Sequence, residues 1–304
     1  MNIRISVYWY VFILYVCVYV VLLHKHEIFS FDELHYGKYV SLYMKNTFFF
    51  DSHPPLGKQL IAIAAYFAGY DGKFKFDKIG SAYTETIPLV AMRLVPAYFG
   101  SLLIPISYHL MLEVGLSQWT SVLASVLFLF DNSLLTQSRF MLMESMLLSF
   151  ILSGLLCLIK FRKNYINPYS FRWWFWLTTS VVLFTCAFCI KYVGFYSCCL
   201  AVVIIFQDFW QLLAHKKLPD KSVFVRFVAQ LLVIVTVPIF VYLSIFYIHL
   251  GILYKAGPHD SIMTSAFQAS LEGGLASITR GQPLLVAHGS QITLRYDYIS
   301  TLLG

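Results

Sequence analysis

Long runs of apolar residues recur along the chain and are separated by shorter polar stretches. A helix needs about 20 mostly apolar residues to cross the hydrocarbon core of a bilayer, so each run near that length is a candidate span. The runs cover residues 5–23, 87–112, 114–130, 140–159, 173–190, 192–207 and 227–248. The pattern therefore predicts an α-helical polytopic membrane protein with about seven transmembrane helices.

The first run has some features of a cleaved signal peptide. It is, however, longer than a usual signal core, it follows a single basic residue, Arg4, and it ends at His24-Lys25-His26 instead of small residues. We therefore expect an uncleaved first span.

Basic residues cluster between particular spans. They are Lys160, Arg162, Lys163 and Arg172 in one connection and Lys216, Lys217, Lys221 and Arg226 in another. Cytosolic loops carry an excess of Lys and Arg, so a cytosolic N-terminus satisfies both clusters. This orientation places the long stretch 24–86 and the C-terminal segment in the lumen.

The long first loop has helical patterns of its own. Tyr36, Tyr39, Val40 and Tyr43 recur at the spacing of an amphipathic helix that lies along a membrane face, and a second helix is predicted to begin after Pro55. From Gly257 onward, hydropathy falls and glycines punctuate short alternating segments, which is typical of strands and turns. We therefore divide the chain into a membrane-embedded domain, 1–256, and the start of a luminal β-type domain, 257–304, too short to close by itself.

Composition excludes a water-soluble globule, because 59% of the residues are hydrophobic, 12% are charged and the mean hydropathy is +0.71. The net charge of +7 is scattered between apolar runs and forms no basic stripe interleaved with aromatics, so no nucleic-acid partner is expected. Cys186 and Cys189 have the spacing of metal ligands. They lie inside a span without a second pair, so no metal site is predicted.

Two adjacent carboxylates, Asp32 and Glu33, follow the first span. Ser30 and Glu33 match a capping box, in which the two side chains satisfy free amides at a helix start. From this pattern alone a cap is favoured over catalysis, which remains the alternative.

Several cations lie at the edges of spans, where they either hold an anionic ligand or extend to the headgroups. The position of Arg93 suits a guanidinium that holds a phosphate by two hydrogen bonds, and extension to the headgroups stays equally open. Arg139 and Glu144 are five residues apart, a poor spacing for a pair on one helix, and Glu144 is expected to share a helix face with Gln137. Lys191 sits between two spans, where ending a helix is the simpler role.

His53 precedes two prolines, so it either caps a turn or contacts a ligand, and the turn is favoured.

These residues fall in segments that resemble the protein O-mannosyltransferases, glycosyltransferase family 39. The matching segments are FDELHYG at 31–37, FFDSHPPLGK at 49–58, MRL at 92–94, QSR at 137–139, KYVGF at 191–195 and GPHD at 257–260. The tail, with LEGG at 271–274 and GSQITL at 289–294, looks most like the animal protein O-mannosyltransferase 1 group, and the likeness ends near Arg295.

The resemblance implies a GT-C type fold with the beginning of a luminal MIR β-trefoil, in the endoplasmic reticulum membrane. It implies inverting transfer of mannose from dolichyl-phosphate mannose to Ser or Thr hydroxyls of luminal proteins, and pairing with a related subunit. No cofactor is expected beyond this lipid-linked donor, and no metal, because the loop has no Asp-x-Asp motif.

The resemblance also implies roles for individual residues. Asp32 becomes the base or acceptor-orienting carboxylate and Glu33 its support. Arg93 becomes the clamp for the dolichyl phosphate. Arg139, Lys191 and His53 join it as substrate contacts.

Two other functions stay open at this point. A truncated, non-catalytic subunit that pairs with or regulates a partner transferase fits the point where the likeness ends. A transporter is the general alternative for a polytopic protein, but we find no internal repeat of the kind that transporters show.

Overall fold

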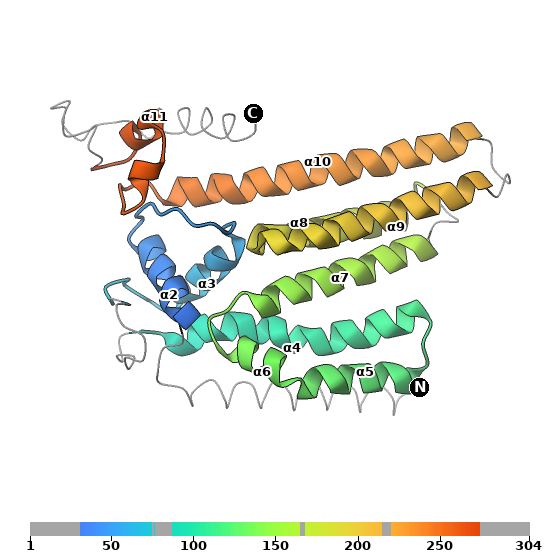
Figure 1. Cartoon of the computed structure of the whole chain (residues 1–304), viewed down its shortest axis with the longest axis horizontal. Coiled ribbons are helices and arrows are strands. Elements are labelled where there is room, and N and C mark those ends of the chain that lie inside the picture. Colours follow the sequence, from blue (N-terminus) through green and yellow to red (C-terminus); the bar gives the residue numbers. More distant parts are fainter. Residues whose placement is uncertain (1–30, 75, 77–86, 165–167, 215–219, 274–304) are drawn as a thin grey trace. The chain divides into compact units, whose positions relative to one another are not determined.

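The structure is a computed structural model that describes residues 31–74, 76, 87–164, 168–214 and 220–273. Within these ranges the regular structure is helical (Figure 1). The elements are α2 (Phe31–Met44), α3 (Leu56–Phe67), α4 (Leu89–Val114), α5 (Gln118–Phe130), α6 (Asn132–Arg139), α7 (Glu144–Lys163), α8 (Phe171–Ile190), η1 (Tyr192–Gly194), α9 (Phe195–Ala214), α10 (Asp220–Ile252), η2 (Asp260–Ile262) and α11 (Ser265–Ala269).

Five of the expected membrane spans agree with long apolar helices of the described chain. Five segments are long and apolar enough to cross a bilayer: Leu89–Val114, Glu144–Lys163, Phe171–Ile190, Tyr192–Ala214 and Lys221–Ile252. A sixth arises if α5 and α6, bent by 56° to each other, form one broken span. The expected first span, 5–23, lies outside the described residues.

The connection between α5 and α7 differs from the sequence-based expectation. Asp131 follows α5 in an extended conformation and caps α6 by accepting a 2.8 Å hydrogen bond from the amide of Leu134 in the first turn of that helix. The expected pairing of faces between Gln137 and Glu144 is therefore wrong, because Gln137 lies on α6 and Glu144 begins α7. Phe140, which follows the last residue of α6, is extended, so the chain leaves the helix between Gln137 and Glu144.

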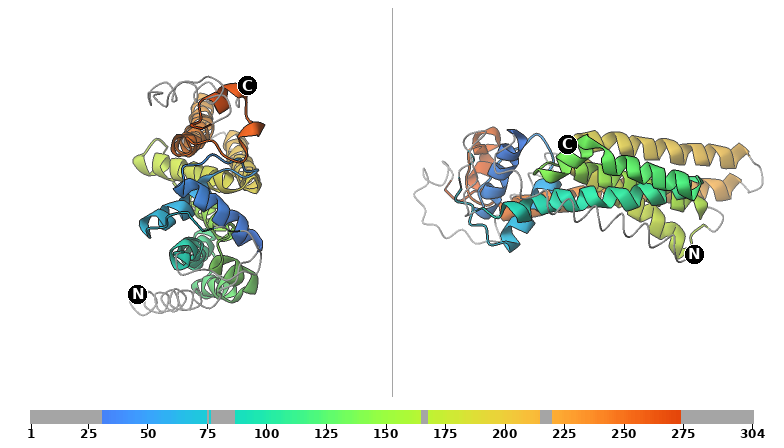
Figure 2. Two further views of the ribbon diagram at one scale, coloured as in Figure 1. Left: turned by 90° about the vertical axis from the view of Figure 1, so that its left-hand side faces the viewer. Right: turned by 90° about the horizontal axis from the view of Figure 1, so that it is seen from below.

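The described residues form two compact units, those within 93–242 and those within 31–92 together with 243–273. In the first unit α7, α8 and α9 pack together around Phe161, Trp173 and Phe184 (Figure 2). α7 and α8 approach closely because Gly154 has no side chain, and the Ser180 hydroxyl donates to the Gly154 carbonyl at 2.9 Å. Small residues allow such close contact between helices in lipid, where apolar burial gives little driving force.

The second unit contains α2, α3 and the segment that follows α10. Two isolated parallel bridges connect Thr47 to Lys255 and Lys255 to Glu272. Gly257 lies so close to the carbonyl of Phe48 that a Cβ would fall 1.9 Å from its oxygen. The loop after α2 is therefore held against the chain that follows α10.

The strand pattern expected from Gly257 onward is wrong for the described part of that segment. It forms η2 and α11 instead, and the Thr264 side chain caps α11 by accepting from the Phe267 amide. Residues 274–304, where most of the expected β domain falls, lie outside the described residues. The boundary at 256/257 stays a prediction.

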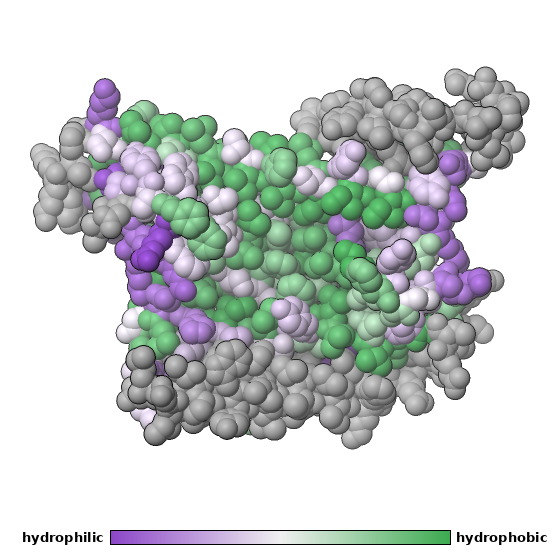
Figure 3. Space-filling model, turned by 180° about the vertical axis from the view of Figure 1, so that it is seen from behind, coloured by the Kyte–Doolittle hydropathy of each residue, from purple (hydrophilic) through white to green (hydrophobic). Residues whose placement is uncertain are grey.

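Many large apolar side chains of α9 and α10 are exposed, among them Phe206, Val235 and Phe240. Figure 3 shows apolar side chains over the middle of the long helices on the face in view, with hydrophilic residues gathered toward their ends. This distribution suits helices whose solvent is the hydrocarbon of a bilayer.

Candidate active site

The two adjacent carboxylates lie in the first turn of α2, and their surroundings differ. Asp32 is exposed, whereas the side chain of Glu33 is fully buried at 0%. Negative side chains are stabilised at a helix start by the partial positive charge of the free amides. The expected capping box rests on Ser30, which lies outside the described residues. Only Asp32 of the two presents its carboxylate at the surface of its unit.

A buried ion pair shapes the loop that follows α2. The Lys58 ammonium is 1% exposed and donates to the Asp51 carboxylate and, at 2.9 Å, to the carbonyl oxygen of His53. It also lies 5.1 Å from the centre of the Tyr39 ring, within cation–π range. His53 thus contributes its backbone carbonyl to a turn, in keeping with the structural role that the two prolines favoured.

Burial and the nearby charge set the protonation of this cluster. Burial lowers the pKa of Lys58, and the charge of Asp51 opposes that shift. Burial, with a smaller contribution from Asp51, raises the pKa of Tyr39 to about 12, so its hydroxyl keeps its proton near neutral pH. The Tyr39 ring also stacks on Phe49, with centroids 4.5 Å apart.

Sequence reasoning did not single out this pair. The available signal was a lysine on the apolar side of α3 with an aspartate seven residues before it. A buried cation needs a partner.

Further contacts connect the loop to the end of α10. The Tyr43 hydroxyl and Nδ1 of His249 form a 2.6 Å hydrogen bond, and Gln59 donates to the carbonyl of Ile245 at 3.1 Å. Asn46, at φ 56°, donates to the carbonyl of Ile252 at 3.1 Å. Burial raises the pKa of Tyr43 well above its usual value. These bonds join residues about 200 positions apart and hold α2 and α3 against the end of α10.

The predicted phosphate ligands belong to the first unit. Arg93 lies in the second turn of α4, is 1% exposed, and its guanidinium lies 5.3 Å from the centre of the Phe140 ring. Burial of a guanidinium this deep argues against simple extension to the headgroups.

Lys191 follows the last residue of α8 and donates to the Glu144 carboxylate at the start of α7. Arg139 ends α6, five residues before Glu144, where α7 begins. Within the described part of the chain, the Arg139 Nε and the Glu144 Oε2 are buried and have no hydrogen-bond partner. Buried polar atoms that lack a partner are costly unless a ligand or water completes them.

The structure thus gathers the candidate residues in two groups. Asp32, Glu33 and His53 belong to the second unit, and Arg93, Arg139 and Lys191 to the first. In the ranges that the structure describes, no group of three or more His, Cys, Asp or Glu side chains is placed to hold a metal ion.

A solved structure has a similar fold. It is the Saccharomyces cerevisiae protein O-mannosyltransferase Pmt1–Pmt2 complex bound to the sugar donor, which matches with a TM-score of 0.79 and 28% identity over 87% of this chain and 37% of that chain. The fold is therefore that of a multi-spanning membrane glycosyltransferase of the GT-C type.

The sequence comparisons are more specific. The family model described as dolichyl-phosphate-mannose-protein mannosyltransferase matches residues 7–254, and the chain belongs to this family. Protein O-mannosyltransferase 1 of Drosophila melanogaster is 53% identical over 88% of this chain and 30% of its own length. Protein O-mannosyl-transferase 1 of Mus musculus is 45% identical over 87% and 36%. The chain thus spans about a third of the length of these curated relatives.

Proposed function

We propose that this chain carries the catalytic part of an enzyme that transfers mannose from dolichyl-phosphate mannose to Ser or Thr hydroxyls of proteins. The observation that carries the proposal is the family match over residues 7–254, a range that contains all six candidate site residues. The likeness to the yeast complex in its donor-bound state supports it.

In the proposed reaction the acceptor hydroxyl oxygen bonds to C1 of the mannose while the bond from C1 to the phosphate oxygen breaks. Attack from the face opposite the leaving group inverts the configuration. Asp32 takes the hydroxyl proton, and dolichyl phosphate leaves with the bonding electrons. An exposed carboxylate at a helix start suits the base role, since an acceptor must reach it. Glu33, buried beside it, supports its position.

The leaving phosphate gains negative charge as the bond breaks, so fixed cations nearby lower the barrier. We assign this role to Arg93, whose buried guanidinium offers a planar set of donors, with Arg139 and Lys191 as further contacts. The Lys191–Glu144 pair keeps the ammonium in place before the donor binds. We also propose that His53, in the loop after α2, contacts the acceptor protein.

The proposal includes the setting of the enzyme. It works in the endoplasmic reticulum membrane, with a cytosolic N-terminus and the first long loop in the lumen. A related O-mannosyltransferase subunit completes it, as the Pmt1–Pmt2 pairing of the solved neighbour suggests. Residues 257–304 begin a luminal MIR domain.

The first prediction concerns Asp32→Asn. Loss of the base is expected to reduce mannose transfer to an acceptor peptide by about 100-fold or more. The assay uses microsomes from cells that express the protein together with a related subunit. Asp71→Asn is the matched control, because Asp71 is an exposed carboxylate of the same loop that pairs with the Lys73 ammonium at the surface and accepts a hydrogen bond from the Lys73 amide, which an asparagine side-chain oxygen can also accept. Transfer that survives Asp32→Asn undiminished contradicts the base assignment, and a wild-type protein without transfer contradicts the function.

A further inference from the structure

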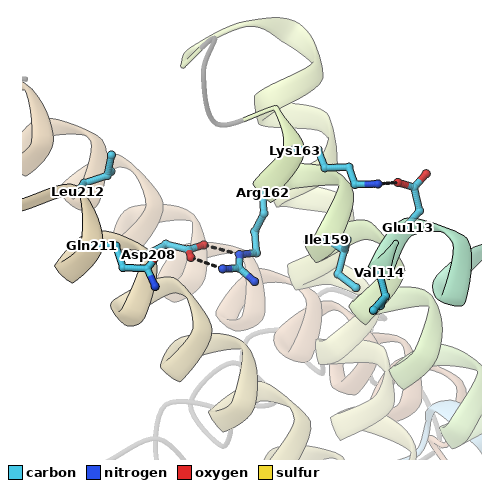
Figure 4. Close-up of a pocket in the computed structure, with 8 residues that line it drawn as sticks. All are labelled: Glu113, Val114, Ile159, Arg162, Lys163, Asp208, Gln211 and Leu212. Atoms are coloured by element: carbon cyan, nitrogen blue, oxygen red, sulfur yellow. Dashed lines mark hydrogen bonds and ion pairs between the residues drawn. The ribbon is translucent and has the colours of Figure 1, made fainter. Parts of the chain in front are cut away.

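A second polar site lies in the first unit, where the C-terminal ends of α4, α7 and α9 meet (Figure 4). It is an open pocket of about 570 Å³. Its lining consists of Glu113, Val114, Ile159, Arg162, Lys163, Asp208, Gln211 and Leu212. None of the candidate active-site residues lines it. Arg162 and Lys163 are the last two residues of α7, and Glu144 is its first. The full length of α7 therefore separates this pocket from the Lys191–Glu144 pair.

The two cations that line the pocket form ion pairs, but these pairs do not use all of their hydrogen-bond donors. Arg162 donates from Nε and Nη2 to the two Asp208 oxygens at 2.8 and 2.6 Å, and Lys163 donates to Glu113 at 2.6 Å (Figure 4). A guanidinium has five N–H donors and an ammonium three, so both groups keep donors for another acceptor. Both side chains are about half exposed.

The local charge favours an anion. Lys160 lies 3.9 Å from Glu113, so three cations face the two carboxylates of Glu113 and Asp208. The carboxylates hold the two long basic side chains in one geometry, which lowers the entropy cost of binding.

The pocket also has an apolar side. Ile159 lies one helical turn before Arg162 on α7, and Val114 and Leu212 add to it from α4 and α9. Two tryptophans near these helix ends are exposed. Trp119, at the start of α5 just after α4 ends, is 84% exposed, and Trp210, near the end of α9, is 65% exposed. Tryptophan is enriched where membrane meets water, so the pocket lies at the level of the lipid headgroups.

We propose that this pocket binds the phosphate headgroup of an anionic glycerophospholipid of the bilayer. The phosphate accepts hydrogen bonds from Arg162 and Lys163, and the acyl chains continue along Ile159 and the exposed apolar surface of α9. Basic pockets between membrane helices favour anionic headgroups in this way. A free anion makes no use of the apolar wall, so a membrane lipid is the occupant that fits both halves of the lining.

The test measures lipid retained by the purified full chain. The protein is equilibrated with phosphatidylcholine containing a minor fraction of phosphatidylserine, and native mass spectrometry counts the bound lipids. The wild-type chain is expected to retain phosphatidylserine preferentially. Each basic contact near a membrane surface changes affinity by about fivefold, so Arg162→Gln with Lys163→Gln should weaken retention by about tenfold or more.

Arg172→Gln is the matched control. Arg172 is an exposed cation in the first turn of α8, the helix that follows α7, and it does not line the pocket. It should leave retention unchanged. If it lowers retention as much as the double variant, net charge and not the pocket attracts the lipid, and the proposal is overturned.

Leu212→Trp fills the pocket without altering any charge, so it separates binding from folding. Loss of phosphatidylserine with an unchanged melting temperature supports the site, whereas full retention contradicts it. Added inorganic phosphate is the last arm. Displacement of the lipid by millimolar phosphate would mean a site for free anions and would overturn the assignment to a lipid.

Discussion

The Lys58 ammonium donates to the Asp51 side chain and to the His53 carbonyl from a position that leaves 1% of its surface exposed. A buried ion pair seldom adds net stability over an apolar pair, but the loss of one partner leaves a charge without compensation. The pair connects α3 to the turn before it, and Tyr39 and Phe49 cover it with aromatic rings. The Lys58 side chain thereby holds the turn at Asp51 and His53 against the start of α3.

Replacement of Lys58 by Met is therefore expected to destabilise the protein by about 3 kcal/mol, because Asp51 stays partly buried without its counter-charge. Chemical unfolding of the purified protein measures this. Adding Asp51→Asn to Lys58→Met should restore much of the loss. Lys73→Met is the control, because its pair with Asp71 is exposed and its loss should change stability by about 0.5 kcal/mol or less. Equal effects of the two lysine variants would contradict this account.

At the scale of elements, helix contacts decide what the apolar pattern leaves open. α7 and α8 meet where Gly154 faces the ring of Phe184, and a Cβ on this glycine would lie 2.9 Å from the ring. Gly251, near the end of α10, has no neighbouring atom within 4 Å of such a Cβ. Both glycines lie inside apolar helices, and only their neighbours distinguish them.

Gly154→Leu should push α7 and α8 apart and cost about 1–3 kcal/mol through overpacking. The same change at Gly251 should have little effect or raise stability slightly through better helix propensity. Thermal unfolding in detergent compares the two variants. A similar melting temperature for both would rule out the close α7–α8 contact.

At the scale of the whole molecule, the basic residues in the last turn of α7 predict which side of the membrane each loop faces. Anionic lipids and the insertion process keep Lys- and Arg-rich loops in the cytosol, so the α7–α8 connection should be cytosolic and the loop after α2 luminal.

Single cysteines in an otherwise cysteine-free protein test this orientation. Tyr169 and Ser52 are exposed positions in these two connections. An impermeant maleimide should label Tyr169→Cys in sealed microsomes, and Ser52→Cys only after the membrane is opened. The reverse pattern would invert the proposed topology and place Asp32 on the cytosolic side.

The sequence by itself determined the helical class and the approximate spans, because a bilayer imposes one length and one polarity on every helix that crosses it. Local motifs also indicated the resemblance to the mannosyltransferase family, which the family match confirmed. The end of the third run at residue 130 agrees with the end of α5, but the separate helix α6 escaped prediction, because its ends depend on the local conformation at Asp131 and Phe140.

Only the tertiary structure decided which of the two carboxylates of α2 is exposed and which cations have partners. Lys191 meets Glu144 across 47 residues, and Tyr43 meets His249 across 206. Such pairs depend on how helices pack, and a one-dimensional pattern contains no information on which faces meet. The same holds for the pocket at the end of α7, whose lining comes from three helices.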